Sequence, residues 1–154
     1  MNKKILLKNI ALLAAAMFFV GDRILKIAAV KGLWEMPINL LGSWLQFDFV
    51  PNYFIAFSLP MGGRLLLIIT GIIILSILFY IFYLFLAKKL RWELFFPLTV
   101  LLFGAISNFI DRVRYGYVID YLSGRYFTVF NLADVLIVAA VIWFLFKTFQ
   151  KNNK

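Results

Sequence analysis

Apolar residues along the chain are grouped into four long stretches that short polar segments separate. The longest uncharged run, residues 65–87, has 23 residues, and about 20 apolar residues in a helix are enough to cross the hydrocarbon core of a membrane. Three further stretches, residues 5–25, 92–110 and 131–149, are apolar in the middle and polar near one end. The pattern predicts four membrane-spanning helices with both termini on the same side.

Composition excludes a water-soluble globular protein. Hydrophobic residues make up 64% and charged residues 15% of the 154 positions, and the mean hydropathy is +0.95. Soluble domains have about 45–50% apolar and about 25% charged residues. The length leaves room for one four-span membrane domain, residues 1–154, and for no large soluble domain beside it.

The distribution of basic residues predicts the orientation. Nine of the 16 basic residues lie at one side of the four predicted spans, where Glu93 is the single acidic residue, and such a face is cytoplasmic by the positive-inside rule. The formal net charge of +9 therefore indicates topology and contact with anionic lipids, and no nucleic-acid partner is expected. The nine residues are Lys3, Lys4, Lys8, Lys88, Lys89, Arg91, Lys147, Lys151 and Lys154.

The N-terminal stretch has an alternative interpretation. Lys3 and Lys4, an apolar run and the three alanines at 14–16 are also typical of a cleavable signal peptide. Apolar residues continue past the alanines to Val20, which favours a retained span.

The two outer connections predict a small β-rich platform. Residues 31–63 contain two tryptophans and three prolines, which predicts a short segment on the membrane surface followed by extended chain. In the second connection, residues 117–121 and 125–130 are β-prone and Leu122-Ser123-Gly124 separates them, as in a hairpin. The expected fold is an all-α membrane protein with four transmembrane helices and an extracytoplasmic β platform.

Acidic side chains are the main candidates for chemistry. The chain has no Cys and no His, which excludes thiolate nucleophiles and Ser/His/Asp triads. Six of the seven acidic residues fall on the predicted outer side. No ligand cluster or Gly-rich phosphate loop is present, so no metal or organic cofactor is expected.

Asp120 and Asp134 form the most informative pair. Asp134 lies one helical turn inside the fourth predicted span, where an ionised carboxylate costs a few kcal/mol or more; alone, it could equally be a helix N-terminal Asp that offsets the macrodipole. Antiparallel packing of the third and fourth spans is expected to bring Asp120 close to it. Two neighbouring carboxylates tend to share one proton and titrate as a unit, which is the chemistry of an aspartic peptidase.

Five segments carry a resemblance to a known family. In order, spacing and predicted membrane side the chain resembles lipoprotein signal peptidase, the bacterial type II signal peptidase. The segments are Asp22-Arg23-Ile24-Leu25-Lys26; Asn52 with Ala56-Phe57-Ser58; Gly104-Ala105-Ile106-Ser107-Asn108-Phe109-Ile110-Asp111-Arg112; Gly116-Tyr117-Val118-Ile119-Asp120-Tyr121; and Phe130-Asn131-Leu132-Ala133-Asp134.

This resemblance implies an intramembrane aspartic endopeptidase of the bacterial cytoplasmic membrane with its site at the outer face. Such an enzyme removes the signal peptide of a prolipoprotein by cleaving before the diacylglyceryl-modified Cys. Asp120 and Asp134 would be its catalytic dyad. The partners implied are the prolipoprotein substrate and membrane lipids, and a monomer is expected. Seven residues would orient the dyad and substrate or support the site: Asn52, Asn108, Asp111, Arg112, Asn131, Asp22 and Lys26.

Several of these residues also have purely structural interpretations. Asp111 and Arg112 at a helix end are expected to contribute a salt bridge that shapes the site. Asp22 and Lys26 have the i,i+4 spacing of a helical ion pair. Asn131 could cap the fourth span, hydrogen-bond the dyad, or do both.

Three positions depart from the family pattern. Phe54 stands where a small residue, often Gly, is usual two positions after the loop Asn; Ser107 stands where Gly is common; and Tyr121 replaces the usual Phe. The bulky Phe54 is expected to alter backbone shape or substrate fit in the first outer connection.

Two other classes of protein are alternatives. A small proton-coupled transporter would also have four spans and an intramembrane acid, but it should carry that acid near mid-span. A non-catalytic membrane scaffold would tolerate Asp120→Asn and Asp134→Asn, because amides preserve helix caps but abolish acid/base chemistry.

Overall fold

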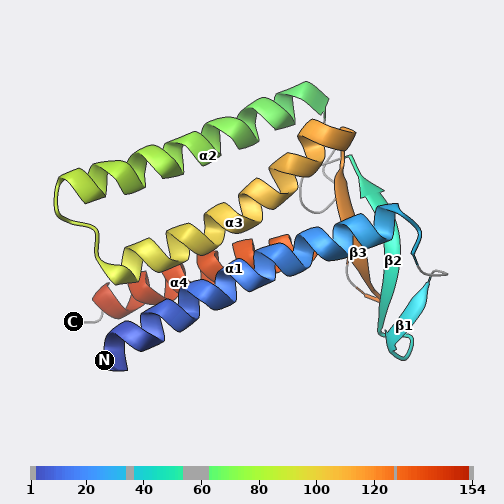
Figure 1. The fold of residues 1–154 in the computed structure, drawn as a ribbon, viewed down its shortest axis with the longest axis horizontal. Coiled ribbons are helices and arrows are strands. Elements are labelled where there is room, and N and C mark those ends of the chain that lie inside the picture. Colours follow the sequence, from blue (N-terminus) through green and yellow to red (C-terminus); the bar gives the residue numbers. More distant parts are fainter. Residues whose placement is uncertain (1–2, 34–36, 54–62, 127, 153–154) are drawn as a thin grey trace.

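Four long helices and a small sheet form the structure. The computed structural model describes residues 3–33, 37–53, 63–126 and 128–152. The helices are α1 (Lys3–Val30), α2 (Gly63–Leu86), α3 (Trp92–Tyr115) and α4 (Leu132–Asn152). The sheet lies at one end of the helical bundle, and both chain termini lie at the opposite end (Figure 1).

Three of the helices are long and apolar enough to cross a membrane. Within the described residues they are Ile5–Val30, Gly63–Leu86 and Trp92–Tyr115. The chain is therefore mostly helical with three candidate membrane spans. Helix α4 occupies the fourth predicted stretch, and its crossing remains a prediction.

Helices α1 and α3 continue past their predicted ends at residues 25 and 110. The third predicted span stopped just before Asp111, and the first stopped just before Lys26, although it already contained Asp22 and Arg23. In the structure Asp22, Lys26 and Asp111 are fully buried against one another inside the protein. The charges therefore do not end the helices, because they are paired within the bundle.

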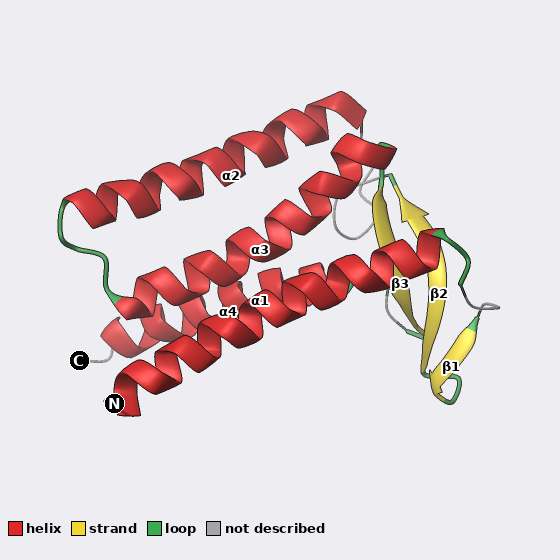
Figure 2. Cartoon of the chain, in the orientation of Figure 1, coloured by secondary structure: helices red, strands yellow, loops and turns green. Residues whose placement is uncertain are grey.

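An antiparallel sheet joins the α1–α2 connection to the α3–α4 connection (Figure 2). Its strands are β1 (Ile38–Leu41), β2 (Leu45–Asn52) and β3 (Val118–Gly124), in the order β1-β2-β3. Asn52 pairs with Val118 and Val50 pairs with Asp120. The register thus places Asn52 next to the part of β3 that carries Asp120.

The predicted hairpin in the second connection is wrong. Leu122, Ser123 and Gly124 continue β3 and pair with β2 instead of forming a turn, because β2 offers a full antiparallel partner. The returning chain makes a single β-bridge, Leu122 with Phe130. In the first connection, residues 38–41 and 45–52 are strands, so the extended chain predicted there is confirmed.

Close packing of α3 on α4 sets the distance between their site residues. A Cβ atom built at Gly104 would lie 2.5 Å from the carbonyl oxygen of Ala133 and 2.7 Å from Cγ1 of Ile137. Gly116 then ends α3 in the left-handed region, at φ 79°, and its N–H bonds the Arg112 carbonyl oxygen. The chain therefore leaves α3 sharply and enters β3 beside the start of α4.

Candidate active site

Asp120 lies on β3 and is held by two amides. Its side chain is 1% exposed. The Nδ2 of Asn52, at the end of β2, donates to Asp120 Oδ2 at 2.8 Å, and the Nδ2 of Asn131 donates to Oδ1 at 2.6 Å. Both amides donate their N–H groups to the carboxylate, and so orient it.

Asp134 lies in the first turn of α4 and is held by two other donors. The Nδ2 of Asn108, from α3, donates to Asp134 Oδ1 at 2.8 Å, and the backbone N–H of Asn131 donates to Oδ2 at 3.2 Å. The N–H of Asp134 in turn donates to Asn131 Oδ1 at 3.0 Å. This reciprocal pattern is a capping box.

Asn131 therefore joins the two carboxylates. It caps α4 and bonds both Asp120 and Asp134, so both structural interpretations of this residue are confirmed. Its Nδ2 also donates to Asn108 Oδ1 at 3.2 Å. The two carboxylates consequently belong to one amide network.

The environment of Asp120 favours its protonated form. Burial, followed by the negative charge of Asp134, raises the pKa of Asp120 to about 7, against the opposing hydrogen bonds from Asn52 and Asn131 and the charge of Lys26. The group can thus gain or lose a proton near neutral pH, as acid/base chemistry requires.

A buried ionic cluster supports the amide network from α1. Lys26 Nζ donates to Asn108 Oδ1 at 2.7 Å and forms ion pairs with Asp111 at 2.7 Å and Asp22 at 3.2 Å. The i,i+4 pair of Asp22 and Lys26 predicted from the sequence is confirmed. Asn108 hydrogen-bonds to both Lys26 and Asp134, and so connects the ionic cluster to the carboxylate.

Asp111 forms a salt bridge with Arg23 of α1 as well as with Lys26, and it accepts a backbone hydrogen bond from β3. Arg23 Nη1 contacts Asp111 Oδ1 at 2.5 Å, and the N–H of Ile119 donates to Oδ2 at 3.3 Å. Sequence reasoning missed Arg23. The signal was present, because a cation within an apolar stretch needs a buried partner.

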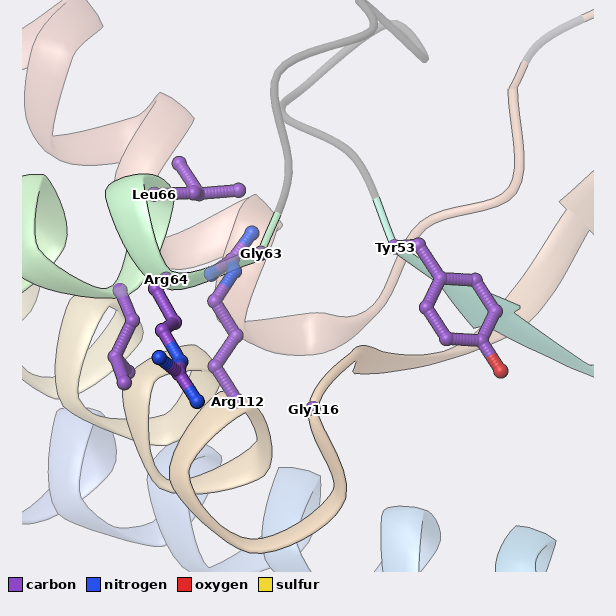
Figure 3. A pocket seen from close by; sticks show the side chains of 7 residues that line it. Tyr53, Gly63, Arg64, Leu66, Arg112 and Gly116 are labelled. Atoms are coloured by element: carbon purple, nitrogen blue, oxygen red, sulfur yellow. The ribbon is translucent and has the colours of Figure 1, made fainter.

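Arg112 lines a cavity of about 190 Å³ at the sheet end of α2 and α3 (Figure 3). Its guanidinium interacts electrostatically with Asp134, Asp120 and Asp111. Tyr53 and Arg64 also line the cavity. Phe54 and Ala56-Phe57-Ser58, singled out in the sequence, lie outside the described residues.

Two hydroxyl groups at the site were not predicted. Ser107 and Tyr121, noted only as departures from a family pattern, both hydrogen-bond to Asp22. Neither residue type signals such a bond in an apolar sequence context. Within the described residues, no group of three or more acidic side chains is placed to hold a metal ion.

Asp120, buried on β3, and Asp134, in the first turn of α4, thus share one amide network beside helices that are long and apolar enough to cross a membrane. The family described as signal peptidase (SPase) II matches residues 14–150. The chain belongs to this family and is a bacterial membrane protease.

Curated relatives agree with this assignment. The chain is similar to the lipoprotein signal peptidase of Caldicellulosiruptor bescii, with 35% identity over 137 residues and 88% of each chain covered. It is also similar to that of Clostridium tetani, with 35% identity over 127 residues and 79% of this chain and 80% of the relative covered. The lipoprotein signal peptidase of Bartonella quintana is 44% identical over 123 residues, 71% of each chain.

Solved structures share the fold. One structure, described as a bacterial membrane enzyme at 2.3 Å resolution, superposes with a TM-score of 0.77 at 24% identity over 94% of this chain and 90% of that one. A second, a bacterial membrane enzyme at 1.9 Å resolution, has a TM-score of 0.71 at 25% identity over 91% of this chain and 92% of that one.

Proposed function

We propose that the chain is an intramembrane aspartic endopeptidase that removes signal peptides from diacylglyceryl-modified prolipoproteins by cleaving before the lipidated Cys. Asp120 and Asp134 are its catalytic dyad. Family membership supports the substrate class, because the curated relatives are lipoprotein signal peptidases.

One observation carries the aspartic mechanism: Asp120 and Asp134 are oriented by a shared amide network in a chain without His or Cys. Amides hold a carboxylate in place in either protonation state, because they donate to it without carrying a charge. The pKa of Asp120, raised to about 7, supports a dyad that holds one proton between its members.

The reaction needs one ionised and one protonated carboxylate. The ionised member takes a proton from a water molecule, whose oxygen forms a bond to the scissile carbonyl carbon. The protonated member donates its proton to the amide nitrogen as the carbon–nitrogen bond breaks. The pair titrates as a unit, and either Asp can take either role.

The proposed topology has four spans, with both termini cytoplasmic and the site at the outer boundary of the membrane. Both termini and the α2–α3 connection, with Lys88, Lys89 and Arg91, lie at the end of the bundle away from the sheet (Figure 1). The positive-inside rule makes that end cytoplasmic. A signal helix would then reach the dyad laterally from the bilayer, with its lipid tails in the outer leaflet.

Supporting roles follow from the contacts. Asn52, Asn108 and Asn131 orient the dyad, and Asp22, Lys26 and Asp111 hold Asn108 and β3. Arg112 places a positive charge toward the carboxylates and would bind the substrate backbone beside them.

The test is cleavage of a diacylglyceryl-modified prolipoprotein by the detergent-solubilised protein, compared with Asp120→Asn and Asp134→Asn. Asp48→Asn is the matched control, because Asp48 lies on β2 outside the amide network. We expect cleavage before the lipidated Cys by the native protein and the control, and losses of at least about 10³-fold in both dyad variants.

Activity retained by a folded dyad variant would refute the aspartic mechanism. A native protein that cleaves no prolipoprotein would refute the function and favour a scaffold. A transporter is disfavoured because both acids lie at the sheet end of the bundle, not at mid-span.

A further inference from the structure

Two hydroxyl groups from distant parts of the chain converge on one buried carboxylate. Ser107 Oγ, on α3, donates to Asp22 Oδ2 at 2.5 Å, and the hydroxyl of Tyr121, on β3, donates to Asp22 Oδ1 at 2.8 Å. All three residues are 0% exposed. Asp22 therefore joins α1, α3 and β3 at one point.

The same cluster also holds the start of α4. The N–H of Leu132 donates to the Tyr121 hydroxyl oxygen at 3.1 Å, and the N–H of Ala133 donates to Asp22 Oδ1 at 3.2 Å. A helix leaves its first four N–H groups without partners inside the helix. Here two of the four, those of Leu132 and Ala133, are bonded by Tyr121 and Asp22.

The remaining two N–H groups are those of the capping box. The N–H of Asn131 donates to Asp134 Oδ2 at 3.2 Å, and the N–H of Asp134 donates to Asn131 Oδ1 at 3.0 Å. Every N–H of the turn that carries Asp134 is thus hydrogen-bonded, and two of these four bonds are to Tyr121 and Asp22. A shift of this turn would move the Asp134 carboxylate away from Asn108.

We propose that the hydroxyl groups of Ser107 and Tyr121 are positioning groups for Asp134, which act through Asp22 and the first turn of α4. This inference rests on the proposed function in so far as Asp134 is catalytic. It adds two residues that do not touch the reacting atoms.

The direction of each bond is well defined. Burial and the negative charge of Asp22 raise the pKa of Tyr121, so its hydroxyl keeps its proton and donates to Asp22 while it accepts from Leu132. Phenylalanine at position 121 would remove the acceptor of the Leu132 N–H. Asp22 Oδ1 would lose the Tyr121 hydroxyl and keep the Ala133 N–H as a donor. Loss of the Ser107 hydroxyl would leave Oδ2 with Lys26.

The experiment compares Tyr121→Phe, Ser107→Ala and the double variant. Matched controls remove the same groups elsewhere. They are Tyr126→Phe, at an exposed tyrosine, and Ser76→Ala, whose hydroxyl bonds only a carbonyl of its own helix α2 among the described contacts.

We expect kcat to fall about 3- to 10-fold in each single variant, the range that one hydrogen bond supplies, with KM changed less than about twofold. The double variant should lose less than the product of the two single effects, because both hydroxyls act through the same carboxylate. The controls should match the native protein.

A second measurement does not depend on catalysis. In amide hydrogen exchange followed by mass spectrometry, peptides covering Leu132 and Ala133 should exchange faster in Tyr121→Phe than in the native protein, and at the native rate in Tyr126→Phe. If the native protein cleaves no prolipoprotein but these peptides still exchange faster in Tyr121→Phe, the proposed function is refuted and the positioning of α4 is supported.

Unchanged exchange at Leu132 would overturn the inference. So would a Tyr121→Phe protein with native kcat, even if its Tm is lowered, because a merely structural role predicts that result. A rise in KM at constant kcat would also overturn it, since that would place the hydroxyl in substrate binding.

Discussion

Gly104→Ala tests whether the close approach of α3 to α4 sets the geometry of the dyad. The added Cβ would lie 2.5 Å from the Ala133 carbonyl oxygen, about 0.9 Å short of the 3.4 Å at which ordinary contact begins. The atom it meets belongs to the backbone immediately before Asp134. The two helices must therefore separate by nearly that distance.

Misplacement of a catalytic group by about 1 Å can reduce the rate about 10²-fold. We expect a loss of kcat of that order in prolipoprotein cleavage, together with about 1–3 kcal/mol of destabilisation from overpacking. Gly71→Ala is the control, because its Cβ would meet the Phe109 ring at 3.5 Å, an ordinary contact, and alanine is the better helix former. If Gly104→Ala matched Gly71→Ala in both kcat and Tm, the reasoning would be refuted.

Two further predictions concern the amide network. Because the pKa of Asp120 is raised to about 7, the folded protein binds this proton more tightly than an unfolded chain, where Asp titrates near about 3.9. The contribution of Asp120 to stability is therefore complete below about pH 4 and is lost as the pH rises through about 7. Over that interval the Tm of the native protein should fall relative to the Tm of Asp120→Asn. Parallel Tm profiles of the two proteins would contradict this. Asn52→Ala should lower kcat about tenfold with little change in Tm, whereas Asn131→Ala should also cost about 1 kcal/mol of stability through the lost cap; equal Tm values for the two variants would contradict the capping role.

The positions of the helices could be predicted from the sequence, because long apolar runs have few alternatives at membrane depth. Asp120 and Asp134 were also recognisable as a pair, since a carboxylate one turn inside an apolar helix needs an explanation. Their amide partners were found through the resemblance of the motifs. Each of these signals is local in the chain.

Pairing between distant residues could not be predicted in the same way. Arg23 and Asp111 are 88 positions apart, and nothing in the sequence indicates that these two residues form a pair. The hairpin prediction failed for a related reason: residues 122–124 have turn-like composition, but β2 competes for them as a strand partner. Hydroxyls such as that of Tyr121 give no sign of their acceptor until the backbone is known.

The pairing of Asp22 with Lys26 within α1 has a consequence for biogenesis. The other polar contacts of Asp22, with Ser107, Tyr121 and Ala133, involve residues 85, 99 and 111 positions later in the chain. During most of translation, Lys26 is therefore the partner of Asp22 that has already been made. The i,i+4 pair offsets these two charges within a single helix and so lowers the cost of placing α1 in lipid, whereas Arg23 gains its partner Asp111 only when α3 is made. The site is complete when α4, the last helix, arrives.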